Sequence, residues 1–188
     1  MLECISNSPA NLLADSISHK TSHALQIISG PRGCGKTTCC TQIAAQIQAA
    51  GLSVGGLICP AVFEGEKKVA IEQVDLYTGQ QRRLGTRRES ECTVENTPES
   101  TVGCWQMDAS VLAWGNAILA GLGDEDLIII DELGPLELKE GRGYHEGLRL
   151  LDEERYQMAL VVVRPSLLAL AQSRWPQAEV MMLEARPR

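Results

Sequence analysis

Long hydrophobic runs are missing from this sequence, and aromatic residues are scarce. No apolar run approaches the roughly 20 residues that a membrane-spanning helix needs, and residues 1–20 lack the basic start and apolar stretch of a secretion signal. Aromatic residues make up only 4% of the chain, and no basic stripe is interleaved with them. We therefore expect a cytoplasmic protein that binds neither a membrane nor a nucleic acid.

Cysteine spacing also lacks the patterns of a disulfide framework or a zinc site. The seven cysteines form no Cys-x-x-Cys pair, and the three histidines are not spaced with them as zinc ligands would be. We interpret the cysteines as mostly buried free thiols in a reduced compartment. The net charge of −7 repels polyanions in general, so an anionic substrate has to be held by local groups.

The chain does contain enough apolar residues to form one hydrophobic core. The 188 residues, 44% of them hydrophobic, fit a single domain. Strand-like runs alternate with helical patterns, which predicts an α/β fold with a mostly parallel sheet flanked by helices on both faces. The strands are expected at 24–29, 53–59, 126–130, 158–163 and 179–183, and the helices at 36–50, 108–122, 144–154 and 165–173. We expect residues 1–22 to be a flexible N-terminal extension and residues 23–188 to form the domain.

One segment departs from this alternation. Residues 68–83 contain two strand-like runs around a Thr78-Gly79 turn, which is typical of a β-hairpin. We therefore expect a hairpin excursion from the sheet. Residues 102–107 are expected to form a further strand.

A glycine-rich loop joins the first strand to the first helix. Gly30 to Thr38 read GPRGCGKTT, which satisfies the pattern Gly-x-x-x-x-Gly-Lys-Thr. Glycines let the backbone N–H groups turn inward around phosphates, and the following helix adds its positive N-terminal end. The loop therefore predicts a P-loop that binds a nucleoside triphosphate. Its nucleotide-binding residues are Gly30, Pro31, Arg32, Gly33, Cys34, Gly35, Lys36, Thr37 and Thr38.

Three side chains of this loop carry separate expectations. Lys36 reaches the β- and γ-phosphates as a point charge and is one of two predicted catalytic residues. The Thr37 hydroxyl is a predicted ligand of Mg²⁺, the expected cofactor. Cys34 has two interpretations, either a small side chain that fills space or a thiol acidified by the helix end and open to redox control.

A second acidic element follows about a hundred residues later. Leu127 to Glu132 read LIIIDE, an apolar strand that ends in two acids. Asp131 is the predicted second metal ligand, acting with the Thr37 hydroxyl. Glu132 is the other predicted catalytic residue, a general base that polarises the attacking water. An acid directly after such an aspartate resembles the RecA-like division, which inserts a strand between the two motif strands, and residues 102–107 are our candidate for that strand.

The two motifs together resemble a known family. GPRGCGKTT with IIIDELGPLEL (Ile128 to Leu138) is similar to the cancer-related nucleoside-triphosphatase family, small P-loop NTPases first described from thermophiles. The resemblance covers roughly residues 25–183. It implies hydrolysis of ATP, GTP or other nucleoside triphosphates to the diphosphate, with loose base choice. Gly134, Pro135 and Glu137 complete the family signature; Pro135 could redirect the chain, and Glu137 could support the metal site.

Other functions stay open at this point. The arginines of RRLGTRR (Arg82, Arg83, Arg87 and Arg88) fit either a solvated hairpin edge or a group that stabilises the γ-phosphate. Arg164 is a second candidate for that γ-phosphate contact. The alternatives to a triphosphatase are a phosphotransferase or other nucleotide-dependent transferase, and a non-enzymatic regulator gated by nucleotide, with a protein partner. No Asn-Lys-x-Asp or Thr-Lys-x-Asp string for reading guanine occurs.

Overall fold

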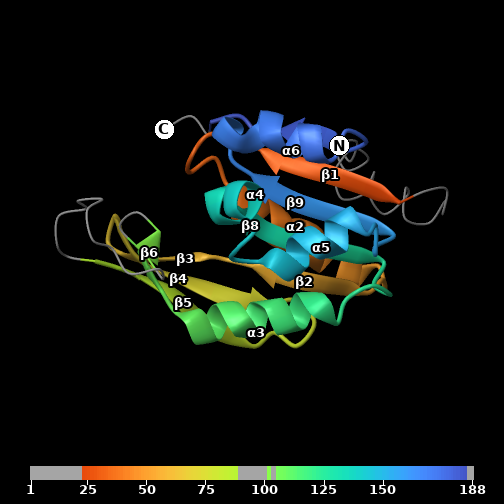
Figure 1. Ribbon diagram of the computed structural model, residues 1–188. Helices are drawn as coiled ribbons and strands as arrows, with labels where there is room; N and C mark the ends of the chain where they lie inside the picture. The colour runs from red at the N-terminus through yellow and green to blue at the C-terminus, as the bar shows by residue number, and fades with distance from the viewer. Residues whose placement is uncertain (1–22, 89–100, 103–104, 186–188) are drawn as a thin grey trace, which may run out of the picture.

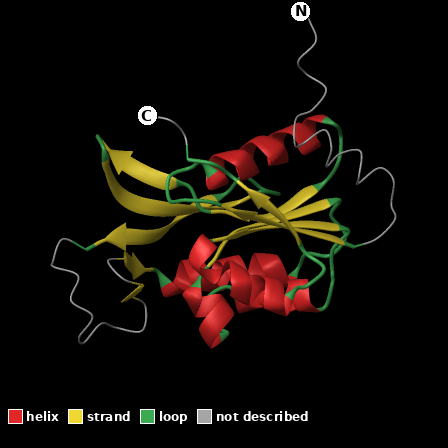
Figure 2. Cartoon of the chain, turned by 90° about the horizontal axis from the view of Figure 1, so that it is seen from above, coloured by secondary structure: helices red, strands yellow, loops and turns green. Residues whose placement is uncertain are grey.

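The computed structural model describes residues 23–88, 101–102 and 105–185, and residues 1–22, the predicted extension, lie outside this range. The described chain forms one ten-stranded sheet that lies between layers of helices. The sheet has a parallel half and an antiparallel half. Strands of the antiparallel half reach beyond the parallel half at one end of the molecule (Figure 1). Figure 2 shows helices on both faces of the sheet, so the predicted α/β architecture is confirmed.

Five strands make up the parallel half. The apolar runs of the four interior strands are largely buried on both faces, as a parallel sheet requires, whereas the edge strand of this half is partly exposed. In spatial order the five strands are β10 (Glu179–Met182), β1 (Ala24–Ser29), β9 (Met158–Val163), β8 (Leu127–Leu133) and β2 (Val54–Ile58). Each pair of neighbours in this half is parallel.

The strand inserted between the two motif strands is not the one expected from the sequence. A strand does separate β1 from β8, but it is β9. The expected candidate, 102–107, forms two short strands at the far end of the sheet, where β7 (Trp105–Met107) pairs with β5. The prediction was wrong because β9 is a run of six buried apolar residues, suited to the centre of a sheet, whereas β7 is half-exposed.

The antiparallel half continues the sheet from β2. Strand β4 (Lys67–Asp75) pairs with β2 and turns back into β5 (Gln81–Arg87), which confirms the predicted hairpin. Beyond β5 lie β7 and β6 (Thr101–Val102). Strand β3 (Ala61–Glu64) was not predicted from the sequence. It pairs with the edge of β4 opposite the edge that pairs with β5. These strands extend past the parallel half at the end where the loop after β1 lies (Figure 1).

Two separate apolar cores lie on the two faces of the sheet. Because side chains alternate along a strand, Ile28 packs with the buried face of α2 (Lys36–Ala49), whereas Ile27 packs with the helices of the opposite face. The second face is covered by α3 (Ala109–Ala120), α4 (Pro135–Glu140), α5 (His145–Asp152), η1 (Pro165–Leu167) and α6 (Leu168–Arg174).

Two residues of the sequence analysis, Asp108 at the start of a predicted helix and Pro135 of the family signature, lie at the N-termini of helices. Asp108 caps α3 through its carboxylate, which accepts hydrogen bonds from the N–H groups of Ser110 and Val111. Pro135 does not merely redirect the chain; it occupies the first turn of α4, a helix that the sequence analysis missed. Within the described ranges, no helix has the length and apolarity needed to cross a bilayer.

Candidate functional site

The glycine-rich loop lies at the carboxyl end of β1, where it wraps the start of α2. Gly30 has a φ of 149°, and a Cβ there would lie 2.5 Å from the carbonyl oxygen of Leu183. Gly35 has a φ of 96°, a left-handed conformation that side chains rarely adopt. These two positions require glycine, which explains the spacing of the motif. Pro31, Arg32 and Gly33 are exposed in the loop, and Thr38 is exposed in the first turn of α2.

Lys36 points back into this loop. Its ammonium donates hydrogen bonds to the carbonyl oxygens of Gly30 at 2.8 Å and Pro31 at 2.9 Å. The buried thiol of Cys34 lies 3.8 Å from the same ammonium. No side chain caps the N-terminus of α2, which the structure describes in full, so no side-chain acceptor occupies its first N–H groups. A cation and free N–H donors at a helix N-terminus form an anion-binding arrangement.

Asp131, at the carboxyl end of β8, faces the start of α2. Its carboxylate accepts a hydrogen bond from the N–H of Cys59 at 3.2 Å, and hydrogen bonding to the Thr37 hydroxyl lowers its pKa. Burial raises the pKa of the Asp131 carboxyl, although these hydrogen bonds and the charge of Lys36 oppose that rise. Two oxygen-bearing side chains from separate motifs therefore interact at this end of the sheet.

Oxygen ligands of this kind suit Mg²⁺, a hard cation that retains several waters. Among the described residues, no group of three or more His, Cys, Asp or Glu side chains is arranged to hold a metal unaided. The Thr37 and Asp131 oxygens would therefore hold a metal ion together with phosphate oxygens and waters, rather than as a closed protein site.

Glu132 is paired with a second side chain that the sequence analysis singled out. Its carboxylate receives hydrogen bonds from the guanidinium of Arg164, with one N–O distance of 3.3 Å. This pairing raises the pKa of Arg164. Arg164 directly follows β9, and Glu132 lies in the neighbouring strand β8. The two candidate groups thus lie together, Glu132 on β8 next to Asp131 and Arg164 directly after the neighbouring strand β9.

Glu137 has a clear structural role next to this pair. Its buried carboxylate accepts hydrogen bonds from the N–H of Gly134 at 2.8 Å and of Tyr144 at 2.9 Å. Burial raises the pKa of this carboxyl, and the two bonds oppose the rise. Glu137 therefore joins the start of α4 to the start of α5 and fixes the chain that leaves Glu132.

Two arginines of the RRLGTRR segment have partners on the hairpin or on α3. The guanidinium of Arg82 lies 4.3 Å from the centroid of the Trp114 ring, and Arg83 forms an ion pair with Glu72 at 2.6 Å. Both contacts hold these arginines against the antiparallel half. Arg87 and Arg88 are exposed.

The sequence analysis missed one cation of the site, Lys68. This half-buried lysine near the start of β4 interacts electrostatically with Arg32 of the loop and with Asp131 and Glu132. Its ammonium lies 4.9 Å from the centroid of the Trp105 ring. The only local signal is its position at the start of a predicted hairpin strand, because its neighbours at the site come from the loop, β8 and β9.

A glycine-rich loop between strand and helix, facing an aspartate two strands away, defines a P-loop NTPase in structural terms. Comparison with known proteins specifies the family: the family described as NTPase matches residues 26–184. The chain belongs to this family, which confirms the resemblance seen in the sequence.

The curated relatives include nucleoside-triphosphatases THEP1 from several organisms. The chain is 31% identical to that of Methanopyrus kandleri over 60% of this chain and 59% of the relative. It is 30% identical to that of Thermofilum pendens over 74% of each chain. The aligned segment thus spans about three fifths of the Methanopyrus kandleri relative.

Two solved structures share the fold. A human cancer-related nucleoside triphosphatase, solved in solution, matches with a TM-score of 0.64 at 19% identity, over 84% of this chain and 87% of that chain. The crystal structure of THEP1 from Aquifex aeolicus matches with a TM-score of 0.60 at 18% identity, over 85% and 89%. Both structures support the fold assignment.

Proposed function

We propose that this protein is a Mg²⁺-dependent nucleoside triphosphatase that releases phosphate from ATP, GTP or related triphosphates. The observation that carries the proposal is the loop in which Gly30 and Gly35 adopt conformations that need glycine and Lys36 lies over the loop carbonyl groups, with Asp131 two strands away, where the Thr37 hydroxyl lowers the pKa of its carboxyl. Family membership supports the same activity.

In this proposal the loop binds the phosphates through its amides. Lys36 would exchange its carbonyl partners for the β- and γ-phosphate oxygens, which are stronger acceptors because they carry charge. Thr37 and Asp131 would hold Mg²⁺, which neutralises charge on the phosphates as the reaction proceeds. Because its net charge is −7, the chain as a whole does not attract an anionic substrate. The substrate therefore has to be held by Lys36, the loop amides and the metal ion.

Glu132 is the proposed general base. It would accept the proton of a water whose oxygen attacks the γ-phosphorus, while the bond to the β–γ bridging oxygen breaks and its electron pair stays on the diphosphate. The ion pair with Arg164 orients this carboxylate. We propose that Arg164 acts as a positioning residue for Glu132.

The arrangement gives less support to the transferase alternative. That alternative depended on the arginines of residues 82–88 as a hint of an acceptor site, and two of them have partners on the hairpin or α3. A triphosphatase needs only water as the acceptor. A regulator gated by nucleotide would bind its nucleotide at the same loop, so a measurement of turnover is needed to distinguish it from a triphosphatase.

The test is a phosphate-release screen across the common nucleoside triphosphates, with and without Mg²⁺ and without any acceptor. Wild-type protein is expected to release phosphate only with Mg²⁺, and the Lys36→Ala variant to release none. A Lys67→Ala variant is the matched control, because Lys67 is an exposed lysine of the hairpin. Tight nucleotide binding without Mg²⁺-dependent release over hours would contradict the proposal and favour the regulator.

A further inference from the structure

Arg164 lies between the glycine-rich loop and the proposed general base. It directly follows β9, the strand that separates β1 from β8. On one side of β9, Val162 pairs with Ile28 of β1. Two residues further along these parallel strands, Arg164 comes level with Gly30, where the glycine-rich loop begins. On the other side of β9, its guanidinium forms an ion pair with Glu132 of β8.

The ion pair uses only one edge of the guanidinium. The Nε and Nη2 groups of Arg164 donate to the two carboxylate oxygens of Glu132, with a distance of 3.3 Å for Nη2. A guanidinium carries its N–H donors in one plane, so this side-on pair leaves the end of the plane, with both N–H groups of Nη1, outside the pair. An edge of this kind matches two oxygens of a phosphate.

The backbone of Arg164 is fixed, whereas its side chain is open to solvent. The carbonyl oxygen of Arg164 accepts a hydrogen bond from the N–H of Leu167 at 2.9 Å, and Pro165 begins η1 directly after it. The side chain of Arg164 is 58% exposed, and that of Glu132 is 29% exposed. A ligand can therefore reach the end of the guanidinium without any rearrangement of the fold.

The partner of Arg164 indicates which phosphate this edge would meet. The water that Glu132 is proposed to activate attacks the γ-phosphorus in line with the bond to the β–γ bridging oxygen. Glu132 and the β-phosphate therefore lie on opposite sides of the γ-phosphate, and a cation bonded to Glu132 is nearer to the γ-phosphate. A diphosphate has no group at that position, whereas Lys36, over the loop carbonyl groups, would serve both nucleotides.

We propose that Arg164 contacts the γ-phosphate oxygens of the bound triphosphate with the end of its guanidinium, while its other edge continues to hold Glu132. Binding of the terminal phosphate and placement of the base are then coupled through one side chain. The same contact selects triphosphate over diphosphate and stabilises the charge on the γ-phosphate oxygens during hydrolysis. This inference rests on the proposed function for the role of Glu132.

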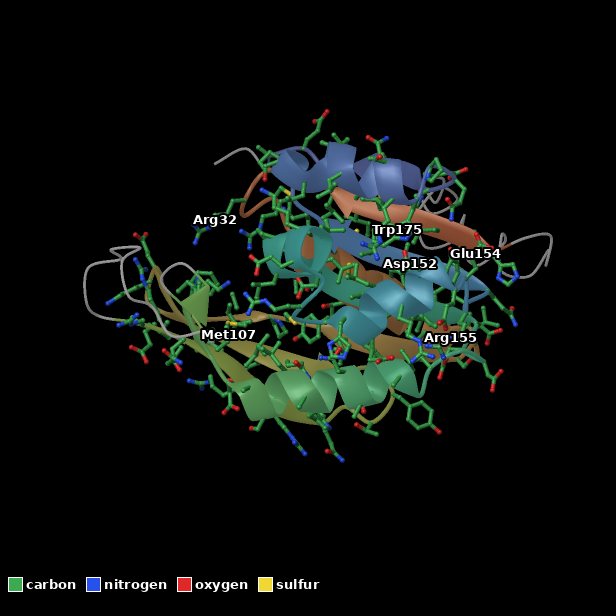
Figure 3. The ribbon with its side chains drawn as sticks, in the orientation of Figure 1. Arg32, Met107, Asp152, Glu154, Arg155 and Trp175 are labelled. Carbon is green, nitrogen blue, oxygen red and sulfur yellow. The ribbon has the colours of Figure 1, made fainter. Side chains whose placement is uncertain are left out.

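A matched control for Arg164 is Arg174, which forms the same kind of side-on pair elsewhere. The Nε and Nη2 groups of Arg174 donate to the two carboxylate oxygens of Asp152, at 2.9 and 2.5 Å. Figure 3 shows that Asp152 lies away from Arg32, which projects from the glycine-rich loop. Arg174→Ala therefore removes an equivalent ion pair without touching the candidate site.

The binding test compares Arg164→Ala with Arg174→Ala. Calorimetric titration uses the β,γ-imido analogues of ATP and GTP, and ADP and GDP, all with Mg²⁺. We expect Arg164→Ala to weaken binding of the triphosphate analogues by about tenfold or more, because charge-assisted hydrogen bonds are lost, and to leave diphosphate affinity within about twofold. Retained diphosphate affinity also shows that the variant is folded. Arg174→Ala should change neither affinity.

A Glu132→Gln background separates a direct contact from an effect that acts through the base. If Arg164 contacts the γ-phosphate, adding Arg164→Ala to Glu132→Gln should weaken analogue binding by about the same factor as in wild type, since the contact does not need the carboxylate. A loss that disappears in this background would show that Arg164 acts on the nucleotide only through Glu132, and the inference would be wrong.

Turnover and rescue complete the test. Arg164→Ala should lower kcat by about a hundredfold or more, as for other arginines on a transferring phosphate. Arg164→Lys, which keeps the charge but not the planar fork, should recover part of the analogue affinity. Equal loss of diphosphate and triphosphate affinity, no loss at all, or the same loss in Arg174→Ala would overturn the inference. If wild-type protein releases no phosphate, the proposed function fails, while the ratio of the two affinities still decides whether Arg164 contacts the terminal phosphate.

Discussion

The parallel and antiparallel halves of the sheet contribute to the site in different ways. In the parallel half, buried apolar strands end in the groups of the two motifs, as at Ser29-Gly30 and Asp131-Glu132. In the antiparallel half, strands β4 and β5 are more exposed and carry charged side chains with individual partners. The comparison indicates that the proposed phosphate and metal groups come from the parallel half, whereas the hairpin contributes charged side chains with partners of their own.

The largest effect is expected in the parallel half, from Lys36→Ala. Removing the ammonium takes away the cation that lies over the loop carbonyl groups, so affinity for both diphosphate and triphosphate should fall by about a hundredfold or more. Calorimetric titration measures both values. The contrast with Lys67→Ala on the hairpin, which should affect neither affinity, sharpens the comparison, and a diphosphate affinity that survives in Lys36→Ala would break it.

The next effect is on turnover, in the Glu132→Gln variant. Glutamine keeps the size of the side chain and a partner for Arg164 but cannot accept the proton, so kcat should fall by about 10²- to 10⁴-fold. Affinity for the β,γ-imido analogue of ATP should remain within a few fold. Single-turnover phosphate release measures the first quantity, and a rate close to wild type would show that another group activates the water.

A smaller effect, on stability, is expected from Glu137→Gln. In glutamine an NH₂ group, which cannot accept a hydrogen bond, replaces one of the two accepting oxygens, so the N–H of Gly134 or of Tyr144 loses its buried partner at a cost of about 1–3 kcal/mol. The free energy of unfolding in urea measures this loss. Folding should persist, because the two apolar cores do not include this carboxylate.

Wild type and Glu137→Gln should also differ in how their stability depends on pH. Burial raises the pKa of Glu137 in the folded state, so the folded chain holds this proton more tightly than the unfolded chain. Its contribution to stability is therefore largest below the ordinary glutamate pKa and declines as pH rises toward the raised value. The stability difference between wild type and Glu137→Gln should shrink over that window, and a difference that grows with pH would contradict this account.

The smallest effect concerns a contact between the two halves. The hydroxyl of Tyr144, before α5, donates to the Oε1 of Gln73 on β4 at 2.6 Å, and Gln73 is fully buried. Tyr144→Phe should cost about 1 kcal/mol of unfolding free energy because the amide oxygen loses its donor. Adding Gln73→Leu should recover part of that loss, since no buried amide then remains; a further loss of the full amount would show that packing dominates.

The parts of the structure that the sequence predicted are those specified by local patterns. Apolar strands, the glycine loop and the cap at Asp108 are encoded by neighbouring residues, and the structure has them within a few positions of the predicted bounds. The sheet order was harder, because which strand lies between β1 and β8 depends on packing of both faces. The short strand β3 and helix α4 carry too few residues for a periodic signal.

The same distinction, between features encoded by local patterns and features that depend on the folded chain, applies to the site. Gly30 to Thr38 with Asp131 and Glu132 could be proposed from two motifs, and the Thr37–Asp131 contact brings those motifs together. The contact of Lys68 with Trp105 could not be found in this way, because it exists only after β7 pairs with the hairpin. The pairing of Glu132 with Arg164 likewise depends on β8 and β9 being neighbours.

The most direct test of the central claim is the gain in affinity that Mg²⁺ gives to a triphosphate. Titration of the β,γ-imido analogue of ATP into wild-type protein and Asp131→Asn, each with and without Mg²⁺, isolates the contribution of the carboxylate to metal binding. The account predicts that Mg²⁺ strengthens binding to wild type by about tenfold or more and that this gain largely disappears in Asp131→Asn. An equal gain in both proteins would contradict the assignment of Asp131 and Thr37 as the metal site.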